Sequence, residues 1–346
     1  MKKHWSVLIY CCGLAAASIG ISINSSGVFY TPVSKSLHIL RGTFSMHMTL
    51  FSLATAIISL FVPKIYQKFS FKKILTFSVI IAVVSTAAMA LGKNAITFYI
   101  LGAIRGMSTS LFSIVPITMI INGWFEKKHG LATSIAFGFS GLGGTLCSPV
   151  LSSVISSFNW QMGYLLKAVI LLLLCLPAVL YPFSMNAKDE GLLPYGYQEK
   201  HETTQNQATS SFHFMSISFI AFFIFGMLIS CITSVTQHLP GYGESLGFPL
   251  TSCAILLSAG MMGNIVSKLI IGSLSDHFGE MKATLMMISV NILGIDLLII
   301  GRSMTLLIVG AFLFGSCYSL GAVAVPLLTK YFFKTENYAK AFPTIS

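Results

Sequence analysis

The sequence predicts an all-α, polytopic membrane protein with about ten transmembrane helices arranged in two bundles, and three observations support that fold class. Hydrophobic residues make up 55% of the 346 residues, charged residues only 9%, and the mean hydropathy is +0.82. Soluble domains carry about 25% charged residues. Apolar stretches recur along the whole chain, and two of the polar stretches between them repeat. This composition excludes an ordinary soluble domain.

The apolar stretches are long enough to be spanning helices, which need about 20 mostly apolar residues. Ten are predicted, at 5–32, 45–66, 74–92, 96–121, 131–156, 161–185, 213–240, 250–271, 283–301 and 304–330. The first follows Lys2, Lys3 and His4, as in a secretory signal. Its apolar run is far longer than the ~7–15 residues of such a signal, so we expect an uncleaved helix.

The net charge of +11 suggests nucleic-acid binding, but the distribution of the charge argues against it. With the N-terminus in the cytoplasm, 14 of the 21 lysines and arginines fall on the cytoplasmic side, 4 fall outside and 3 lie within helices. Such a bias follows the positive-inside rule. We therefore expect a multi-pass protein of the cell membrane with a cytoplasmic N-terminus, a lipid bilayer as its surroundings and no nucleic-acid partner.

A polar segment at 186–212 divides the chain into a six-helix bundle (1–185), a cytoplasmic linker and an incomplete second bundle (213–346). The second bundle holds four helices and the start of the next. Two short polar stretches of the first half recur in the second. "PKIYQKFSFKK" at 63–73 matches "GSLSDHFGEMK" at 272–282, and "WFEKKHGLA" at 124–132 matches "YFFKTENYA" at 331–339. Internal repeats of this kind mark secondary transporters.

The repeat is unfinished in the second half. Two helices follow Ala132 in the first half, whereas only seven residues follow Ala339. We therefore expect helices eleven and twelve to be missing, in a fragment or a truncated product of a protein of about 400 residues.

The repeated loop resembles the loop signature of the major facilitator superfamily, in which Gly, Asp and Gly punctuate a turn between two helices. In "GSLSDHFGEMK" these are Gly272, Asp276 and Gly279. Gly272 lets helices approach, Gly279 permits a tight turn and Asp276 can cap a neighbouring helix. We predict a gating loop here. The first-half copy has Gln67 in place of the acid and Ser70 in place of a glycine, so the two loops do not gate equally.

Four further stretches are similar to the oxalate:formate antiporter and monocarboxylate transporter branch of that superfamily. They are "GVFYTPVSKSL" with "RGTFS", "WFEKKHGLA", "GFSGLGGTLCSPVLSSVISSFNW" and "GLLPYG", which begin at residues 27, 41, 124, 138 and 191. The resemblance implies transport of a small organic anion, such as a carboxylate. It covers most of the chain but is not specific for one substrate.

Charged residues inside the predicted helices are the candidates for the substrate site. A charge at mid-membrane costs ~2.5–3.5 kcal/mol on insertion scales, so such residues usually face a cavity or a partner. Arg105 lies roughly 14 Å into its helix and either contacts an anion or bonds to helix carbonyls or Asp296. Lys167 lies roughly 9 Å deep and either contacts substrate or snorkels to water. Asp296 either neutralises a basic residue, which we favour, or carries a proton.

Lys268 either snorkels to its own loop or faces a central cavity. It shares one helix face with Gly260, Gly263, Asn264 and Ser267, a small polar stripe that favours the cavity. In the resembled branch a basic residue here binds the anion. It is usually arginine, so lysine would bind as a point charge. An acid commonly stands one turn earlier in monocarboxylate transporters, where this chain has Asn264, which cannot carry a proton.

The sequence thus predicts a secondary transporter of a small organic anion, working by alternating access, with Arg105, Lys268, Asn264 and Lys167 at the substrate. A counter-transported anion or a proton is the expected coupling partner, by antiport or symport. Two alternatives stay open: transport of a neutral or cationic solute, and a non-transporting or inactive truncated protein. No pattern for an enzyme, a cofactor or a metal site is found. Gly138, Gly141, Gly143 and Gly144 indicate either close helix packing or a hinge.

Overall fold

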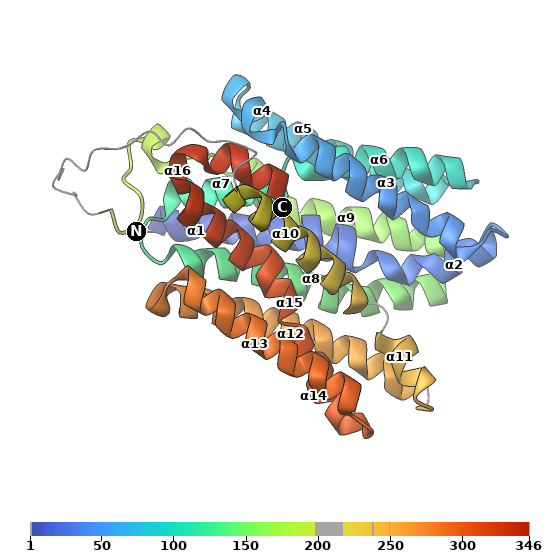
Figure 1. Cartoon of the computed structure of the whole chain (residues 1–346). Coiled ribbons are helices and arrows are strands. Elements are labelled where there is room, and N and C mark those ends of the chain that lie inside the picture. Colours follow the sequence, from blue (N-terminus) through green and yellow to red (C-terminus); the bar gives the residue numbers. More distant parts are fainter. Residues whose placement is uncertain (1, 198–216, 237–238, 249, 346) are drawn as a thin grey trace. The chain divides into compact units, whose positions relative to one another are not determined.

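The computed structural model describes residues 2–197, 217–236, 239–248 and 250–345, and the described residues form an all-α protein (Figure 1). Contacts divide the chain into two compact units. The N-unit comprises Trp5–Thr118 and Ile135–Ser184. The C-unit comprises Met1–His4, Met119–Ser134 and Met185–Ser346. Residues 119–134, from the first half of the chain, group with the second half. This division into units does not test the predicted bundle boundaries at 185 and 213, which stay a prediction.

The first half of the chain, up to residue 184, forms a series of helices joined by short turns. They are α1 (Lys2–Ala15), α2 (Tyr30–Ser36), α3 (Arg41–Ser59), α4 (Val62–Lys68), α5 (Phe71–Ala88), α6 (Ala95–Ser110), α7 (Ile114–Trp124), α8 (His129–Ser157) and α9 (Trp160–Leu180). Within the N-unit α3 packs along α6, and α5 packs along both α6 and α9 (Figure 1). An asparagine directly precedes each of α6 and α9. Its side chain accepts a hydrogen bond from the backbone amide three residues later, which is the preferred N-cap arrangement.

The first spanning segment is not a uniform α-helix. After α1 it continues as the π-helical segment η1 (Ala16–Asn24) and the 3-10 turn η2 (Ser26–Phe29). The backbone NH of Ser25 donates to the carbonyl of Gly20 at 3.1 Å, five residues back. A π-helical segment inside a helix changes which side chains face its neighbours and is frequent at functional sites.

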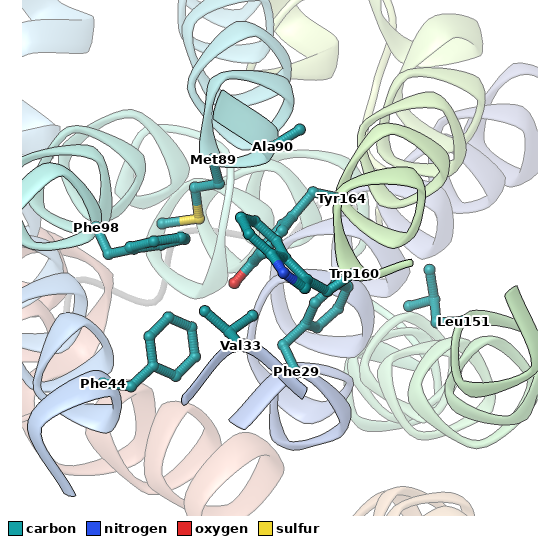
Figure 2. Packing of buried hydrophobic residues seen from close by; sticks show 9 residues of the cluster. All are labelled: Phe29, Val33, Phe44, Met89, Ala90, Phe98, Leu151, Trp160 and Tyr164. Atoms are coloured by element: carbon teal, nitrogen blue, oxygen red, sulfur yellow. The ribbon is translucent and has the colours of Figure 1, made fainter. Parts of the chain in front are cut away.

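One buried core cluster of the N-unit is largely aromatic, and Figure 2 shows its nine residues. They are Phe29, Val33, Phe44, Met89, Ala90, Phe98, Leu151, Trp160 and Tyr164. The rings of Phe29 and Tyr164 stack with centroids 4.1 Å apart. Large apolar rings bury much surface and fix the helices that carry them.

The second half forms a corresponding series of helices. They are α10 (Ile217–Val235), α11 (Leu239–Ser245), α12 (Leu250–Phe278), α13 (Glu280–Ile300), α14 (Met304–Phe314), α15 (Cys317–Ser319) and α16 (Val325–Ile345), with the π-helical η6 (Leu320–Ala324) before α16. Helix α14 packs along α12 and α13 (Figure 1). A buried core cluster forms between these helices and the neighbouring α11 and α15. It comprises Leu239, Leu256, Leu298, Leu307, Ala311, Phe314 and Cys317.

Eight described helical segments are long and apolar enough to cross a membrane, or nine if the bent pair α3 and α4 is one span. Ten were predicted from the sequence. The remaining segment, 213–240, is described only in part, and its apolar helix Phe219–Val235 is shorter than a span. The predicted number of helices is therefore not confirmed, although the all-α membrane fold is.

Besides residues 272–278, which continue α12, two predicted loops are helical instead. Residues 63–68 belong to α4, which is bent by 53° from α3. Residues 331–339 lie inside the continuous helix α16, so the second copy of the repeat lacks the break that separates α7 from α8. Both differences arise where polar residues alone suggested a turn, because a polar stretch at the end of a spanning helix can stay helical.

The predicted linker, 186–212, is described up to residue 197, and this part packs within the C-unit. The 3-10 turn η4 (Ala187–Glu190) begins it, and Lys3 forms an ion pair with Glu190. The amide of Tyr195 donates to the carbonyl of Trp124 at 2.8 Å. A ring nitrogen of His4 lies 2.9 Å from the carbonyl oxygen of Leu193 and donates to it in the tautomer that carries a proton there. These contacts tie the N-terminus and the linker to the turn before α8.

Candidate functional site

Arg105 lies on α6 and is 1% exposed. Its guanidinium donates to the carbonyl of Ser22 in η1 at 3.4 Å and contacts the sulfur of Met89 at 3.4 Å. It also stands 5.5 Å from the ring centre of Phe51, within cation–π range. Of the two structural roles considered for Arg105, a bond to a neighbouring helix carbonyl is present. This contact is long, and a guanidinium has five donors to satisfy.

Lys167 lies on α9 and is fully buried. Its ammonium donates to the hydroxyl of Ser26 at 2.9 Å and stands 5.2 Å from the ring centre of Phe29. Of the two alternatives for Lys167, snorkelling to water is therefore wrong. Its side chain turns inward because the first segment presents a hydroxyl and an aromatic face to it.

Arg105 and Lys167 thus border the same aromatic cluster, and both use the irregular part of the first spanning segment. Sequence reasoning did not find Ser22 and Ser26, although "SINSSG" at 22–27 is an unusually polar run for a spanning helix. Residues 5–118 and 135–184 contain no aspartate or glutamate. The two cations therefore have no counter-charge in their own unit, and a buried cation is costly unless paired. Such a pair is suited to receiving an anion.

The C-unit carries the other two predicted substrate residues on α12. Lys268 is 2% exposed, and Asn264, one turn earlier, is fully buried. Snorkelling of Lys268 to the loop is therefore wrong as well. The amide oxygen of Asn264 has no hydrogen-bond partner among the described residues, and its nitrogen meets only the sulfur of Met261, at 4.0 Å. Buried polar atoms are nearly always hydrogen-bonded, so this oxygen marks a place for water or a ligand.

The polar stripe of α12 is partly a packing surface. A Cβ on Gly263 would lie 1.8 Å from the carbonyl oxygen of Phe312, and a Cβ on Gly315 would lie 2.1 Å from the carbonyl oxygen of Gly260. The glycines therefore let the backbones of α12 and α14 meet. The interpretation that the whole stripe faces a cavity is too broad, because its glycines are covered by another helix.

The favoured pairing of Asp296 with a basic residue is not found among the described residues, and the alternative, that Asp296 carries a proton, stays a prediction. It is exposed on α13, on the same face as Ile292, Leu293, Ile299 and Ile300. The buried face of α13 carries Gly294 and Leu298, about 200° around the helix. Asp296 makes no ion pair with any residue that the structure describes. It stands four residues from the end of α13, about 6 Å along the helix, where water is within reach.

Of the predicted gating loop, Gly272 and Asp276 lie in the last turns of α12, and only Gly279 joins α12 to α13. The carboxylate of Asp276 accepts hydrogen bonds from the backbone amides of Gly130 at 3.2 Å and Leu131 at 2.9 Å, in the first turn of α8. Gly279 has φ +85° and forms the turn itself, a conformation that favours glycine. A Cβ on Gly272 would lie 1.9 Å from the hydroxyl of Ser134. Each loop residue thus meets the start of α8 or shapes the turn.

Around this contact lies a polar cavity of about 1020 Å³ that sequence reasoning did not find. Its lining includes both acids and bases, among them Glu126, His129, Asp276, Glu280 and Lys330. Lys330 of α16 interacts electrostatically with the carboxylates of Glu126 and Glu280. These residues are far apart in the sequence, so only the fold brings them together.

Two of the predicted α8 glycines, Gly143 and Gly144, pack against the first segment. A Cβ on Gly143 would lie 3.1 Å from the carbonyl oxygen of Ala16, and one on Gly144 would lie 2.7 Å from Cβ of Asn24. Close packing, one of the two roles considered, is therefore present. No group of three or more metal-binding side chains occurs within the described ranges.

These features define a multi-pass membrane protein with buried cations and a capped loop at helix ends. The family model described as "Major Facilitator Superfamily" matches residues 11–342, so the chain belongs to the Major Facilitator Superfamily. This is a family of transporters and, in general, not of enzymes. The membership agrees with the all-α, multi-span fold and with a transport function.

Two curated relatives match about half of the chain. An "Uncharacterized MFS-type transporter YcxA" of Bacillus subtilis (strain 168) is 26% identical over 183 residues, which are 52% of this chain and 44% of that protein. The "MFS-type transporter pynF" of Aspergillus niger is 24% identical over 181 residues, 52% of this chain and 39% of that protein. The matched part is therefore less than half the length of each relative.

Among solved structures, the chain is similar to the crystal structure of a point mutant of the nucleoside transporter NupG. The TM-score is 0.61 at 13% identity, and the match covers 99% of this chain and 86% of that one. At this identity the likeness supports the fold alone.

Proposed function

We propose that the protein is a secondary active transporter of a small organic anion, a carboxylate, which binds Arg105 and Lys268 during alternating access. The observation that carries this proposal is the burial of three cations, Arg105, Lys167 and Lys268, in spanning helices. An anion would supply the counter-charge that residues 5–118 and 135–184 lack. Lys167 and the amide oxygen of Asn264 have supporting roles, the latter through a protonated carboxyl or a water molecule.

In this proposal the protein lies in the cell membrane with its N-terminus in the cytoplasm. The Asp276 contact to the start of α8 closes the cytoplasmic side and must break when that side opens. Asn264 cannot carry a proton, so coupling proceeds through a counter-transported anion or through a proton that another group carries. The affinity of the carboxylate for helix N-termini supports a closing role for Asp276.

Transport by the purified protein in proteoliposomes tests the proposal. Labelled monocarboxylates and dicarboxylates are offered with and without an internal anion. Arg105→Ala and Lys268→Ala should each lower transport roughly 10- to 150-fold, because a charge-assisted hydrogen bond contributes about 1.5–3 kcal/mol. The matched control is Lys93→Ala, which removes an exposed cation between two spans and should leave transport unchanged.

Three results would contradict the proposal in different ways. Full transport by both alanine variants would remove Arg105 and Lys268 from the site. Flux that no anion inhibits would favour a neutral or cationic solute. Folded protein that moves none of the compounds and binds none would favour a non-transporting membrane protein.

A further inference from the structure

A basic surface lies at the junction of α3 and α5, on and beside the short helix α4. We define the α4 lysine surface as Lys64, Lys68 and Lys73 together with the exposed rings of Phe61 and Phe69. Helix α3 is part of a candidate span, and α5 begins the next at Phe71. The polar end of the bent pair α3 and α4 and the start of α5 therefore lie where the membrane meets water, and α4 turns by 53° from α3 at this point.

One side of α4 is fixed to the protein. Val62 and Pro63 are buried, and the hydroxyl of Tyr66 donates a hydrogen bond to the carbonyl of Leu111. The other side, with Lys64, Gln67 and Lys68, is exposed. The helix therefore holds its lysines in a fixed position facing away from the bundle.

The charge of this surface is not balanced within the N-unit. The nearby Lys72 donates to the carbonyl of Ala178 at 3.1 Å and to that of Tyr181, so the protein itself uses this ammonium. Lys64, Lys68 and Lys73 make no ion pair with a described residue, and residues 5–118 and 135–184 contain no acid. Lys68 lies 5.6 Å from the ring centre of Phe69. Three ammonium groups thus remain available to an external anion.

The second copy of the repeat indicates what this surface does not do. There Asp276 binds backbone amides of α8. The first copy has the neutral, exposed Gln67 at that position and three exposed lysines near it in the sequence, so it offers no carboxylate to a helix N-terminus. The two copies have opposite charge, and only the second is satisfied by the protein.

We propose that the α4 lysine surface binds the headgroups of anionic phospholipids. Clustered lysines beside a spanning helix attract anionic headgroups, and exposed aromatic rings prefer the interface. Phe61 and Phe69 are 49% and 56% exposed and lie beside the lysines, where acyl chains begin. Charge and amphipathic character together favour a lipid over a soluble anion, which the rings would not recognise.

The test uses the full chain and a lipid readout, so it does not depend on the transported substrate. Protein is incubated in micelles with an equal mixture of phosphatidylcholine and phosphatidylglycerol, and retained lipid is quantified by mass spectrometry. The triple variant Lys64→Gln, Lys68→Gln, Lys73→Gln should lose the preference for phosphatidylglycerol, by about fivefold for each lysine. The control triple Lys35→Gln, Lys93→Gln, Arg302→Gln removes equal charge from other exposed positions and should keep the preference.

The melting temperature gives a second readout, through a thiol dye that reports exposure of the buried Cys11, Cys175 and Cys317. Phosphatidylglycerol vesicles should raise it relative to phosphatidylcholine vesicles, and the triple variant should lose that gain. The charge-conserving Lys→Arg triple should retain it and covers the case in which the glutamine triple fails to fold. Equal lipid retention by the glutamine triple and the parent chain would overturn the proposal. Equal stabilisation by inorganic phosphate would also overturn it, in favour of a soluble anion.

Discussion

Each of the three cations in the spanning helices has a different set of neighbours. Arg105 meets a carbonyl, a sulfur and a ring, and Lys167 meets one hydroxyl and one ring. Lys268 is buried on α12 one turn from Asn264. None of these neighbours of Arg105 and Lys167 carries a negative charge. A group held at such a cost is more consistent with a binding function than with stability.

Replacing Lys167 distinguishes a role in substrate binding from a role in stability. Lys167→Met keeps an unbranched side chain, one atom shorter, and removes its charge, so we expect the protein to become more stable, by up to the about 1–4 kcal/mol found when buried ion pairs are replaced by apolar residues. Transport of the proposed anionic substrate should fall at least about tenfold, as expected from loss of one charge-assisted hydrogen bond. Thermal unfolding followed by a thiol dye and uptake by proteoliposomes measure both effects.

The control for this variant is Leu166→Met, a conservative change at the neighbouring, half-buried position of α9. It should alter neither stability nor transport appreciably. A Lys167→Met protein that melts earlier but transports normally would assign Lys167 a structural role.

At the scale of the helix, the start of α8 depends on a residue 145 positions away in the sequence. Asp276→Ala removes both hydrogen bonds to the amides of Gly130 and Leu131. Because loss of such a cap costs about 0.5–2 kcal/mol, the variant should melt earlier. Asp296→Ala, which removes an exposed acid from α13, should melt like the parent chain. Equal melting of both variants and the parent would mean that the cap contributes nothing to stability.

Close approach of α12 and α14 depends on a missing side chain. Gly263→Ala would place a Cβ 1.8 Å from the carbonyl oxygen of Phe312, a backbone atom that cannot turn away. We expect the two helices to separate and the protein to lose roughly 1–3 kcal/mol of stability, as in other overpacked cores. Gly42→Ala on α3, where nothing lies within 4 Å of the new Cβ, should be neutral or slightly stabilising in a thermal-unfolding assay.

Hydropathy averages over many residues, so it predicts the positions of these helices better than their bends and ends. It locates most spanning helices, because burial in lipid requires long apolar runs. It does not locate the end of α3 at Ser59, which follows from Pro63: the proline lacks an amide to bond that carbonyl. Gly272, at the matching position of the repeat, has its amide, and α12 continues. Bends depend on single backbone groups, which an average over many residues hides.

The site was predictable to a similar extent. The cations Arg105, Lys167 and Lys268 stand out in apolar runs, and all three are buried. Their partners Ser22 and Ser26 do not stand out, because a hydroxyl in a spanning helix can also bond to its own backbone. Whether Lys167 reaches water, or Asp296 faces a neighbour, depends on the rotation of the helix. For a helix apolar all round, the sequence does not specify that rotation.

At the scale of the whole molecule, basic and acidic residues are distributed unequally along the chain, and all the acidic residues lie after the first third. The first acidic residue is Glu126, so the only acidic or basic side chains among the N-terminal 125 residues are those of lysine, arginine and histidine. The lysines concentrate at the N-terminus and around α4, on the ends of the spans that we assign to the cytoplasm. Positive charge resists translocation across the membrane during insertion, which would fix this orientation.

A labelling experiment tests that orientation directly. Lys68→Cys places a reactive thiol on the exposed side of α4, and Lys93→Cys places one before α6, at the other end of α5. A membrane-impermeant maleimide added to intact cells should label residue 93 and not residue 68, and permeabilised cells should show both. The parent chain, whose Cys231 is exposed, measures the background. Labelling of residue 68 alone in intact cells would reverse the orientation, and with it the assignment of the Asp276 contact to the cytoplasmic side. Since α5 is one continuous helix from Phe71 to Ala88, the two positions must lie on opposite faces if it spans the membrane, so this pair of cysteines also tests that span.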